Sequence, residues 1–336
     1  MVISFVSMMM NFVLVATIAL AMFKALEIKP SDKAAVPIFT TIVLTCTHAK
    51  VIVYAPISVG IMNSAVQTII PDYVVTYGEL VFYGWPMFIF MLLFEWVVLK
   101  WYKNSTKNEA KPIMDGAKNI YKAKYEALGH MTMQEKLSVG ALVFLFLWMI
   151  MQSLGVHKFD ITYAFIIANI FLFLAGIADE SCLRNVSIGN VAVVMSFVSV
   201  GVVAAALQLT SLISAGVTSL FGSMGDYWAT VGTLIFGIVS NFILTPYAMM
   251  TMLPTVVISY CIDIGWSWLP HFLSCYMAAD LIFFPYEYPT VLIIFGFGMI
   301  TMKNAIKMLS IKLVLAVIFI IAILMPYWKL LGLYAL

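Results

Sequence analysis

The sequence predicts an all-α, polytopic membrane protein, and its composition and its patterning both support this fold class. Hydrophobic residues make up 63% of the chain and charged residues only 10%, whereas soluble domains are about 25% charged. Mean hydropathy is +1.04, and long apolar runs recur along the whole chain. Several of these runs contain Ser, Asn, Pro or Gly near their middle. We therefore expect helices that cross the membrane, some of them broken at membrane depth.

The clearest interruption is Ser240-Asn241-Phe242, inside the apolar run 227–260. A single helix crossing needs roughly 20 residues, so this run is too long for one span. Thr245 and Pro246 follow the Asn closely and favour a break in the helix. Backbone that leaves the helix inside the bilayer is tolerated only where protein surrounds it or where it lines a cavity. The run therefore predicts a re-entrant hairpin with Asn241 at its tip.

A fainter copy of this pattern, Met10-Asn11-Phe12, lies inside the first apolar run. The first lysine, Lys24, follows this run instead of preceding it, so the run lacks the basic start of a signal peptide. We interpret it as a mature membrane segment. Two Asn-tipped hairpins, one in each half of a chain, are typical of transporters built from repeats.

Two further apolar runs, 34–70 and 266–302, are also too long for single spans. The first predicts a helix unwound near Asn63, because residues that interrupt helices cluster there. These residues are Pro56, Ser58, Gly60, Asn63 and Ser64. The second run has a similar interruption at 285–290. Uninterrupted spans are predicted at 77–102, 137–156, 160–178, 187–205 and 313–335.

Lysine clusters at 24–33, 103–136 and 303–312 predict the orientation of these spans. If each hairpin enters and leaves on one side, all three clusters fall on the same side, as expected for cytoplasmic loops. The two hairpins then open from opposite sides, which is an inverted repeat. The predicted organisation is a first repeat at 1–102, a cytoplasmic Lys-rich linker at 103–136 and a second repeat at 137–336.

This arrangement resembles the divalent anion/sodium symporter family of the ion-transporter superfamily. That family has two inverted repeats, each with a hairpin tipped by Ser-Asn-Thr and a helix unwound at a Pro-Pro-Asn-like loop. The similar segments cover nearly the whole chain, and their order and spacing support the resemblance more than any single motif. In chain order they are Met10-Asn11-Phe12, residues 128–136, Ser240-Asn241-Phe242 with Leu253-Pro254, residues 287–303 and residues 327–332.

The sequence also departs from the family pattern. Phe12 and Phe242 stand where the family has the hairpin Thr that the resemblance assigns to carboxylate binding. The Asn of the unwound loop is kept at Asn63, whereas the second repeat has Val291 near the matching place. Relative to the family, the sequence starts inside the first hairpin. A fragment, an internal start and half of a split transporter all fit this start.

The resemblance implies a secondary-active transporter of small organic anions, di- or tricarboxylate-like, coupled to Na⁺ or H⁺ by alternating access. It also implies a homodimer in the inner or plasma membrane, with the lipid bilayer and a small anion as its partners and no nucleic acid. No cofactor is expected other than Na⁺ if sodium is the coupling ion. We expect the substrate to contact Asn11, Phe12, Ser58, Gly60, Asn63, Ser240, Asn241, Phe242, Tyr288, Pro289 and Thr290.

Ion coupling is expected at Asn11, Asn241, Glu287 and Lys50. An Asn amide offers both a donor and an acceptor, so it can bind an anion and a cation. The alternative role for each of these Asn residues is to cap the end of a broken helix. A carboxylate in the membrane, such as Glu287, is a candidate for binding a cation or carrying a proton. The alternative is a solvated, structural carboxylate at the mouth of a loop. Lys50, at nearly the same height as Asp280 in the other repeat, would supply fixed positive charge or extend to the interface.

The sequence carries no pattern of an enzyme active site. It has no Walker motif, no pair of zinc-binding histidines and no nucleophile elbow. The four cysteines lack metal-ligand spacing. We therefore expect no enzymatic activity, and an intramembrane enzyme is the weakest alternative. The main alternative is a transport-inactive receptor, or a subunit of a split transporter, which the two Phe substitutions favour.

Overall fold

The computed structural model describes residues 28–48, 56–105, 129–157, 161–180, 223–244, 246–296 and 298–334, together with isolated positions between these ranges. All regular structure in these ranges is helical. The helices are α3 (Ala35–Thr47), α4 (Pro56–Gln67), α5 (Tyr77–Ser105), α7 (Met133–Ser153), α8 (Ile161–Leu174), α12 (Asp226–Asn241), α13 (Pro246–Asp263), α14 (Trp268–Ala278), α15 (Pro289–Gly296), α16 (Met302–Phe319) and α17 (Met325–Leu330). The predicted all-α class is confirmed.

Three helices in the described ranges are long and apolar enough to cross a membrane. They are α5, α7, and the continuous helix that runs from Met302 to Leu330. This last helix consists of α16, a π-helical turn at Ile320–Leu324, and α17. At a rise of about 1.5 Å per residue, its 29 residues extend about 43 Å, more than the roughly 30 Å hydrocarbon core of a bilayer.

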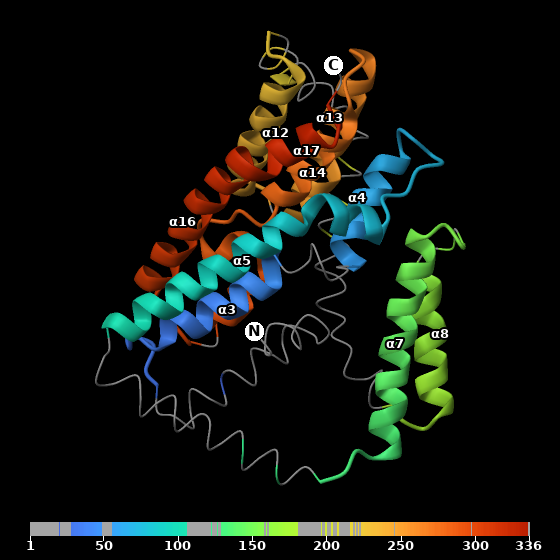
Figure 1. Cartoon of the computed structure of the whole chain (residues 1–336), viewed down its shortest axis with the longest axis vertical. Helices are drawn as coiled ribbons and strands as arrows, with labels where there is room; N and C mark the ends of the chain where they lie inside the picture. The colour runs from blue at the N-terminus through green and yellow to red at the C-terminus, as the bar shows by residue number, and fades with distance from the viewer. Residues whose placement is uncertain are drawn as a thin grey trace.

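Most of the described helices form one bundle (Figure 1). The long helices α5 and α16–α17 run beside one another, and α3 packs against both. At one end of the bundle, α12, α13 and α14 pack together, and α4 lies on α13. Buried apolar side chains from α4, α5, α13, α14 and α17 form the main core, in which Trp328 is fully enclosed.

The hairpin of α7 and α8 stands to the side of this bundle and touches it through α5 (Figure 1). The backbone N–H of Gly78 at the start of α5 donates a 2.8 Å hydrogen bond to the hydroxyl of Ser153 at the end of α7. A Cβ at Gly78 would lie only 2.9 Å from the Cβ of Ser153, so a glycine is needed for this approach. Of the most apolar 18-residue stretch of α7, only 11% is buried in the protein, so most of the apolar surface of this helix is available to lipid.

Two predicted boundaries differ from the structure. Residues 56–67 form the regular helix α4, so the interruption predicted near Asn63 is not found within these residues. Asn63 stays helical because its side chain bonds to a distant backbone group, described below, and not to its own turn. The last long helix starts at Met302, not at 313, because the lysines that the sequence analysis placed in a loop are good helix formers and continue the helix.

Several predicted features lie outside the described residues. These are the hairpin tip at Asn11 and Phe12, the position of Lys50, the span at 187–205 apart from three isolated positions, and residues 106–128 of the linker apart from Lys122 and Glu126.

Candidate functional site at the junction of two helix breaks

The first helix break separates α12 from α13. Helix α12 ends at Asn241 and α13 starts at Pro246, so the interruption falls where the Ser-Asn pair and the proline predict it. Pro246 suits the first turn of a helix, since it has no backbone N–H to leave without a partner. The two helices pack against each other and against α14.

The second break separates α14 from α15. Helix α14 ends at Ala278, and residues 279–288 leave the α-helix before α15 starts at Pro289. The first four residues of this segment, 279–282, are at most 1% exposed. Backbone outside a helix is thus surrounded by protein here, which is the condition for placing such backbone at membrane depth.

Glu287 stabilises the unwound segment from within. Its two carboxylate oxygens accept hydrogen bonds from the backbone N–H groups of Phe283, at 3.1 Å, and Phe284, at 2.8 Å. The residue is only 2% exposed, so it is not the solvated carboxylate that one of the two hypotheses for this position describes. These bonds satisfy two backbone donors that the helix break would otherwise leave without partners.

Asn241 connects the two breaks. Its amide nitrogen donates a 2.8 Å hydrogen bond to the carbonyl oxygen of Ala278, the last residue of α14. Its amide oxygen is buried and accepts no hydrogen bond in the described part of the structure. One turn earlier on α12, Gly237 permits the approach of α14, because a Cβ there would lie 2.6 Å from the Cβ of Ala278. The Asn241 oxygen therefore remains an acceptor at the junction.

A lysine that the sequence analysis did not propose lies at the same junction. The Lys312 ammonium donates to the carbonyl oxygen of Asp280 at 2.7 Å and to the Thr47 hydroxyl oxygen at 3.3 Å. The Lys312 side chain is 2% exposed, and the Asp280 side chain is 1% exposed. A charged ammonium is stable in such surroundings only when nearby oxygen atoms replace its hydration. Lys312 thus ties α16 to the unwound segment and to the end of α3.

Helical periodicity is the signal that would have located Lys312. The buried positions of α16 are Ala305, Leu309, Lys312 and Ala316, which follow one face of the helix. The predicted lysine cluster 303–312 groups Lys312 with Lys303, which is exposed. A helix drawn from residue 302 onward would have placed Lys312 on the apolar face and marked it as a buried charge.

Aromatic rings also pack together at the junction. The Phe242 ring lies 6.0 Å from the Phe283 ring and 6.1 Å from the Phe284 ring, so the tip of the α12–α13 break packs on the unwound segment. Tyr247 and Tyr288 are buried, with their ring centres 6.2 Å apart. Because Tyr247 is in the first turn of α13 and Tyr288 precedes α15, this contact brings the start of the two helices together.

The remaining predicted site residues are placed as follows. Ser240 is half-buried, and its hydroxyl donates to the carbonyl oxygen of Phe236 on its own helix. Pro289 and Thr290 form the first turn of α15, beside Tyr288. Ser58 is buried within α4, and Gly60 on the same helix is exposed, with open space where a side chain would be.

Asn63 makes a structural contact. Its amide nitrogen donates to the carbonyl oxygen of Val75 at 3.1 Å, and its amide oxygen accepts from the backbone N–H of Val75 at 3.0 Å. This pair of bonds fastens α4 to the segment that leads into α5. Both sides of the Asn63 amide are therefore engaged with backbone, unlike the amide of Asn241.

A second buried polar cluster joins α12 to α14 away from the junction. His271 on α14 lies 3.1 Å from a carboxylate oxygen of Asp226, and its other ring nitrogen lies 2.9 Å from the hydroxyl of Thr233. Thr233 donates its own proton to the carbonyl oxygen of Ala229, so the hydroxyl accepts from His271. His271 therefore joins α14 to α12 through contacts at both of its ring nitrogens.

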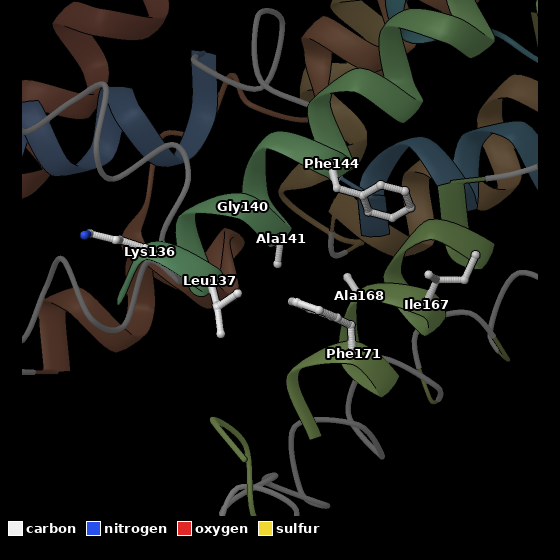
Figure 2. Close-up of a pocket in the computed structure, with 8 residues that line it drawn as sticks. All are labelled: Lys136, Leu137, Gly140, Ala141, Phe144, Ile167, Ala168 and Phe171. Atoms are coloured by element: carbon white, nitrogen blue, oxygen red, sulfur yellow. The ribbon is translucent and has the colours of Figure 1, made fainter. Parts of the chain in front are cut away.

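Two surface grooves lie elsewhere. One of about 320 Å³ runs between α7 and α8 and is lined by Leu137, Ala141, Phe144, Ala168 and Phe171, among others (Figure 2). Lys136 lies at one end and points away from these side chains. A larger groove, of about 510 Å³, lies between α3, α5 and α16. Both grooves have mainly apolar walls, as expected of surfaces that face lipid.

The fold and the junction together define an all-helical membrane protein with two helix breaks that meet in its interior. Compared with known protein families, the sequence matches no family model, and it matches no curated protein. In the described part of the chain, no group of three or more His, Cys, Asp or Glu side chains is arranged to hold a metal ion.

Proposed function

We propose that the chain is a secondary-active transporter of small organic anions and that its binding site is the junction of the two helix breaks. One observation carries this proposal. Two interrupted helices meet through the Asn241–Ala278 hydrogen bond, and the backbone between α14 and α15 is buried in protein. Interrupted helices that meet inside a bundle are the typical framework of substrate and ion sites in transporters.

The charge distribution at the junction supports an anionic substrate. The Tyr247–Tyr288 contact brings together the starts of α13 and α15, and helix N-termini carry partial positive charge. Their backbone N–H groups suit a carboxylate. The bare Asn241 oxygen supplies an acceptor for a hydroxyl or a protonated carboxyl of the substrate. Phe242 takes the place of a hydroxyl-bearing residue, so the wall beside the site is apolar and suits a larger or less charged anion than a simple dicarboxylate.

The proposal also includes the coupling and the assembly that the family resemblance implies. Coupling to Na⁺ or H⁺, an inverted repeat, a homodimer and a cytoplasmic position for the Lys-rich segments all belong to it. The three apolar helices long enough to span a bilayer support the membrane location.

A transport-inactive receptor is the second candidate, and the hydrogen bonds of two predicted site residues favour it. Glu287 already accepts two backbone N–H groups, and the amide of Asn63 is fully engaged with Val75. A receptor would bind the anion at the same junction without carrying it across the bilayer.

The test is uptake into proteoliposomes that contain the purified full chain. Labelled succinate, labelled citrate and an uncharged control are supplied with a Na⁺ gradient, with a pH gradient, and with neither. We expect gradient-driven uptake of an anion and none of the uncharged control, and we expect Asn241→Ala to reduce uptake at least about tenfold.

Asn169→Ala is the matched control, because Asn169 is exposed on α8 and its amide bonds to its own helix at Phe165. Binding of an anion without uptake under either gradient would favour the receptor.

A further inference from the structure

The position of Lys312 carries an inference about the coupling ion. We propose that the Lys312 ammonium is a built-in cation, which occupies the place where a monovalent metal ion would otherwise bind at the helix junction. The inference deepens the proposed function, because it names the group that supplies positive charge in place of a coupling metal ion. Its meaning for transport rests on the proposed function. Whether the ammonium or a metal ion fills this position is a property of the folded protein, and it is tested separately from transport.

The atoms around the ammonium are those that would bind a small hard cation. The carbonyl oxygen of Asp280 lies 2.7 Å from the ammonium nitrogen. The Thr47 hydroxyl lies 3.3 Å away, and it donates its own proton to the carbonyl oxygen of Val43 at 2.8 Å. A lone pair of Thr47 is therefore directed at Lys312. Oxygen ligands of this kind, a carbonyl and a hydroxyl, are the preferred ligands of hard metal cations.

The electrostatic field at this point is negative from several directions. Thr47 is the last residue of α3, and Asp280 follows the end of α14, so two helix C-termini with partial negative charge converge on the ammonium. Glu287 interacts electrostatically with Lys312, and the buried carboxylate of Asp280 belongs to the residue whose carbonyl the ammonium contacts. In transporters, unwound carbonyls and half-helix C-termini bind the coupling cation.

The ammonium itself occupies the two oxygen atoms at the junction, and the void beside the lysine side chain is small. The void beside Lys312 is about 10 Å³, bounded by side chains of α3, α5 and α16, including Phe39, Phe94 and Leu309. This void has room for about one water. Neither Asp280 nor Thr47 lines it, and the oxygens of these two residues are contacted by the ammonium itself. Lys312 and a metal ion are thus mutually exclusive at this position, and shortening the lysine would open a site for Na⁺.

The experiment measures thermal unfolding of the purified full chain in NaCl and in choline chloride at equal ionic strength. For the wild-type protein we expect the same Tm in both salts. For Lys312→Ala and Lys312→Met we expect a lower Tm in choline and a saturable increase with Na⁺, of about 3–5 °C when the Na⁺ concentration is near 100 times Kd. Lys307→Ala is the control, since Lys307 is exposed on the same helix, and we expect no specific Na⁺ effect.

Two results would overturn the proposal. One is a saturable Na⁺-specific rise in Tm of the wild-type protein, which would show a metal site that Lys312 does not fill. The other is a Lys312→Met protein that folds and has the same Tm in both salts. If neither lysine variant folds, the wild-type comparison still decides the matter, together with uptake, which must be independent of Na⁺. Absence of all uptake would count against the transporter function alone, because the Tm measurements do not depend on it.

Discussion

The Asn241 side chain donates a 2.8 Å hydrogen bond to the carbonyl oxygen of Ala278, and this bond joins the end of α12 to the end of α14. The carbonyl groups of the last helical turn have no partners within the helix. In a membrane interior, each one left without a partner destabilises the fold. The Ala278 carbonyl also accepts from the backbone N–H of Leu281 at 3.0 Å, so Asn241 supplies a second donor to this oxygen and links the two interruptions of the second half of the chain.

The first prediction concerns this bond. Replacing Asn241 by Ala removes one of two donors to the Ala278 carbonyl, which keeps the backbone N–H of Leu281, so we expect a loss of about 0.5–1.5 kcal/mol in the free energy of unfolding. Denaturant unfolding of the purified protein measures the loss. Asn169→Ala, on the exposed face of α8, is expected to change the free energy by no more than about 0.5 kcal/mol. Equal losses in the two variants would contradict the role assigned to Asn241.

The second prediction concerns the close approach of α12 and α14 at Gly237. A Cβ on Gly237 would lie 2.6 Å from the Cβ of Ala278, so Gly237→Ala forces the helices apart. We expect destabilisation of about 1–3 kcal/mol, although alanine is the better helix former. Gly140→Ala in α7 is the control, because a Cβ there meets nothing within 4 Å.

A compensating change sharpens this second test. In the double variant Gly237→Ala with Ala278→Gly, the clash is removed, and we expect a substantial part of the lost stability to return. The measurement is a double-mutant cycle, which isolates the coupling between the two positions. Additive effects would show that the two Cβ positions do not limit the approach of the helices.

The third prediction concerns the Glu287 cap. Both carboxylate oxygens accept a backbone N–H, whereas a glutamine would present its NH₂ group to one of these donors. We therefore expect Glu287→Gln to lower the free energy of unfolding by about 1.5–3 kcal/mol. Glu126→Gln serves as the control, because Glu126 is exposed and its ion pair with Lys122 is exposed as well. A Glu287→Gln protein of normal stability whose uptake responds differently to Na⁺ or pH would assign Glu287 to ion coupling instead.

The fourth prediction concerns the buried pair of Asp226 and His271. Removing one member, as in Asp226→Ala, leaves a ring nitrogen of the buried His271 without its carboxylate partner, and we expect a loss of about 1–3 kcal/mol. The double variant Asp226→Ala with His271→Leu removes both partners and is expected to lose less than the sum of the single variants. Unfolding of the four proteins of the cycle measures the coupling. Strict additivity would show that the two side chains do not stabilise each other.

The sequence by itself determined the class of protein and the position of the helix breaks in its second half. Apolar content over long runs is a local property, and so is the effect of proline on a helix. For this reason, the end of α12 and the starts of α13 and α15 fall close to the residues that predicted them. Helix α14, by contrast, ends at Ala278, well before the interruption predicted at 285–290. The same local reasoning did not identify α4, where Asn63 remains inside a regular helix.

Only the tertiary structure decided what each polar side chain does. Asn63 and Asn241 have the same chemistry, yet one is fully engaged with Val75 and the other keeps a bare oxygen at the junction. The partners lie far apart along the chain: Asn241 and Ala278 are 37 residues apart, and Lys312 and Thr47 are 265 apart. A side-chain hydrogen bond forms only over about 3 Å. Which distant oxygen comes within that distance depends on how the helices pack, and no spacing in the sequence reports it.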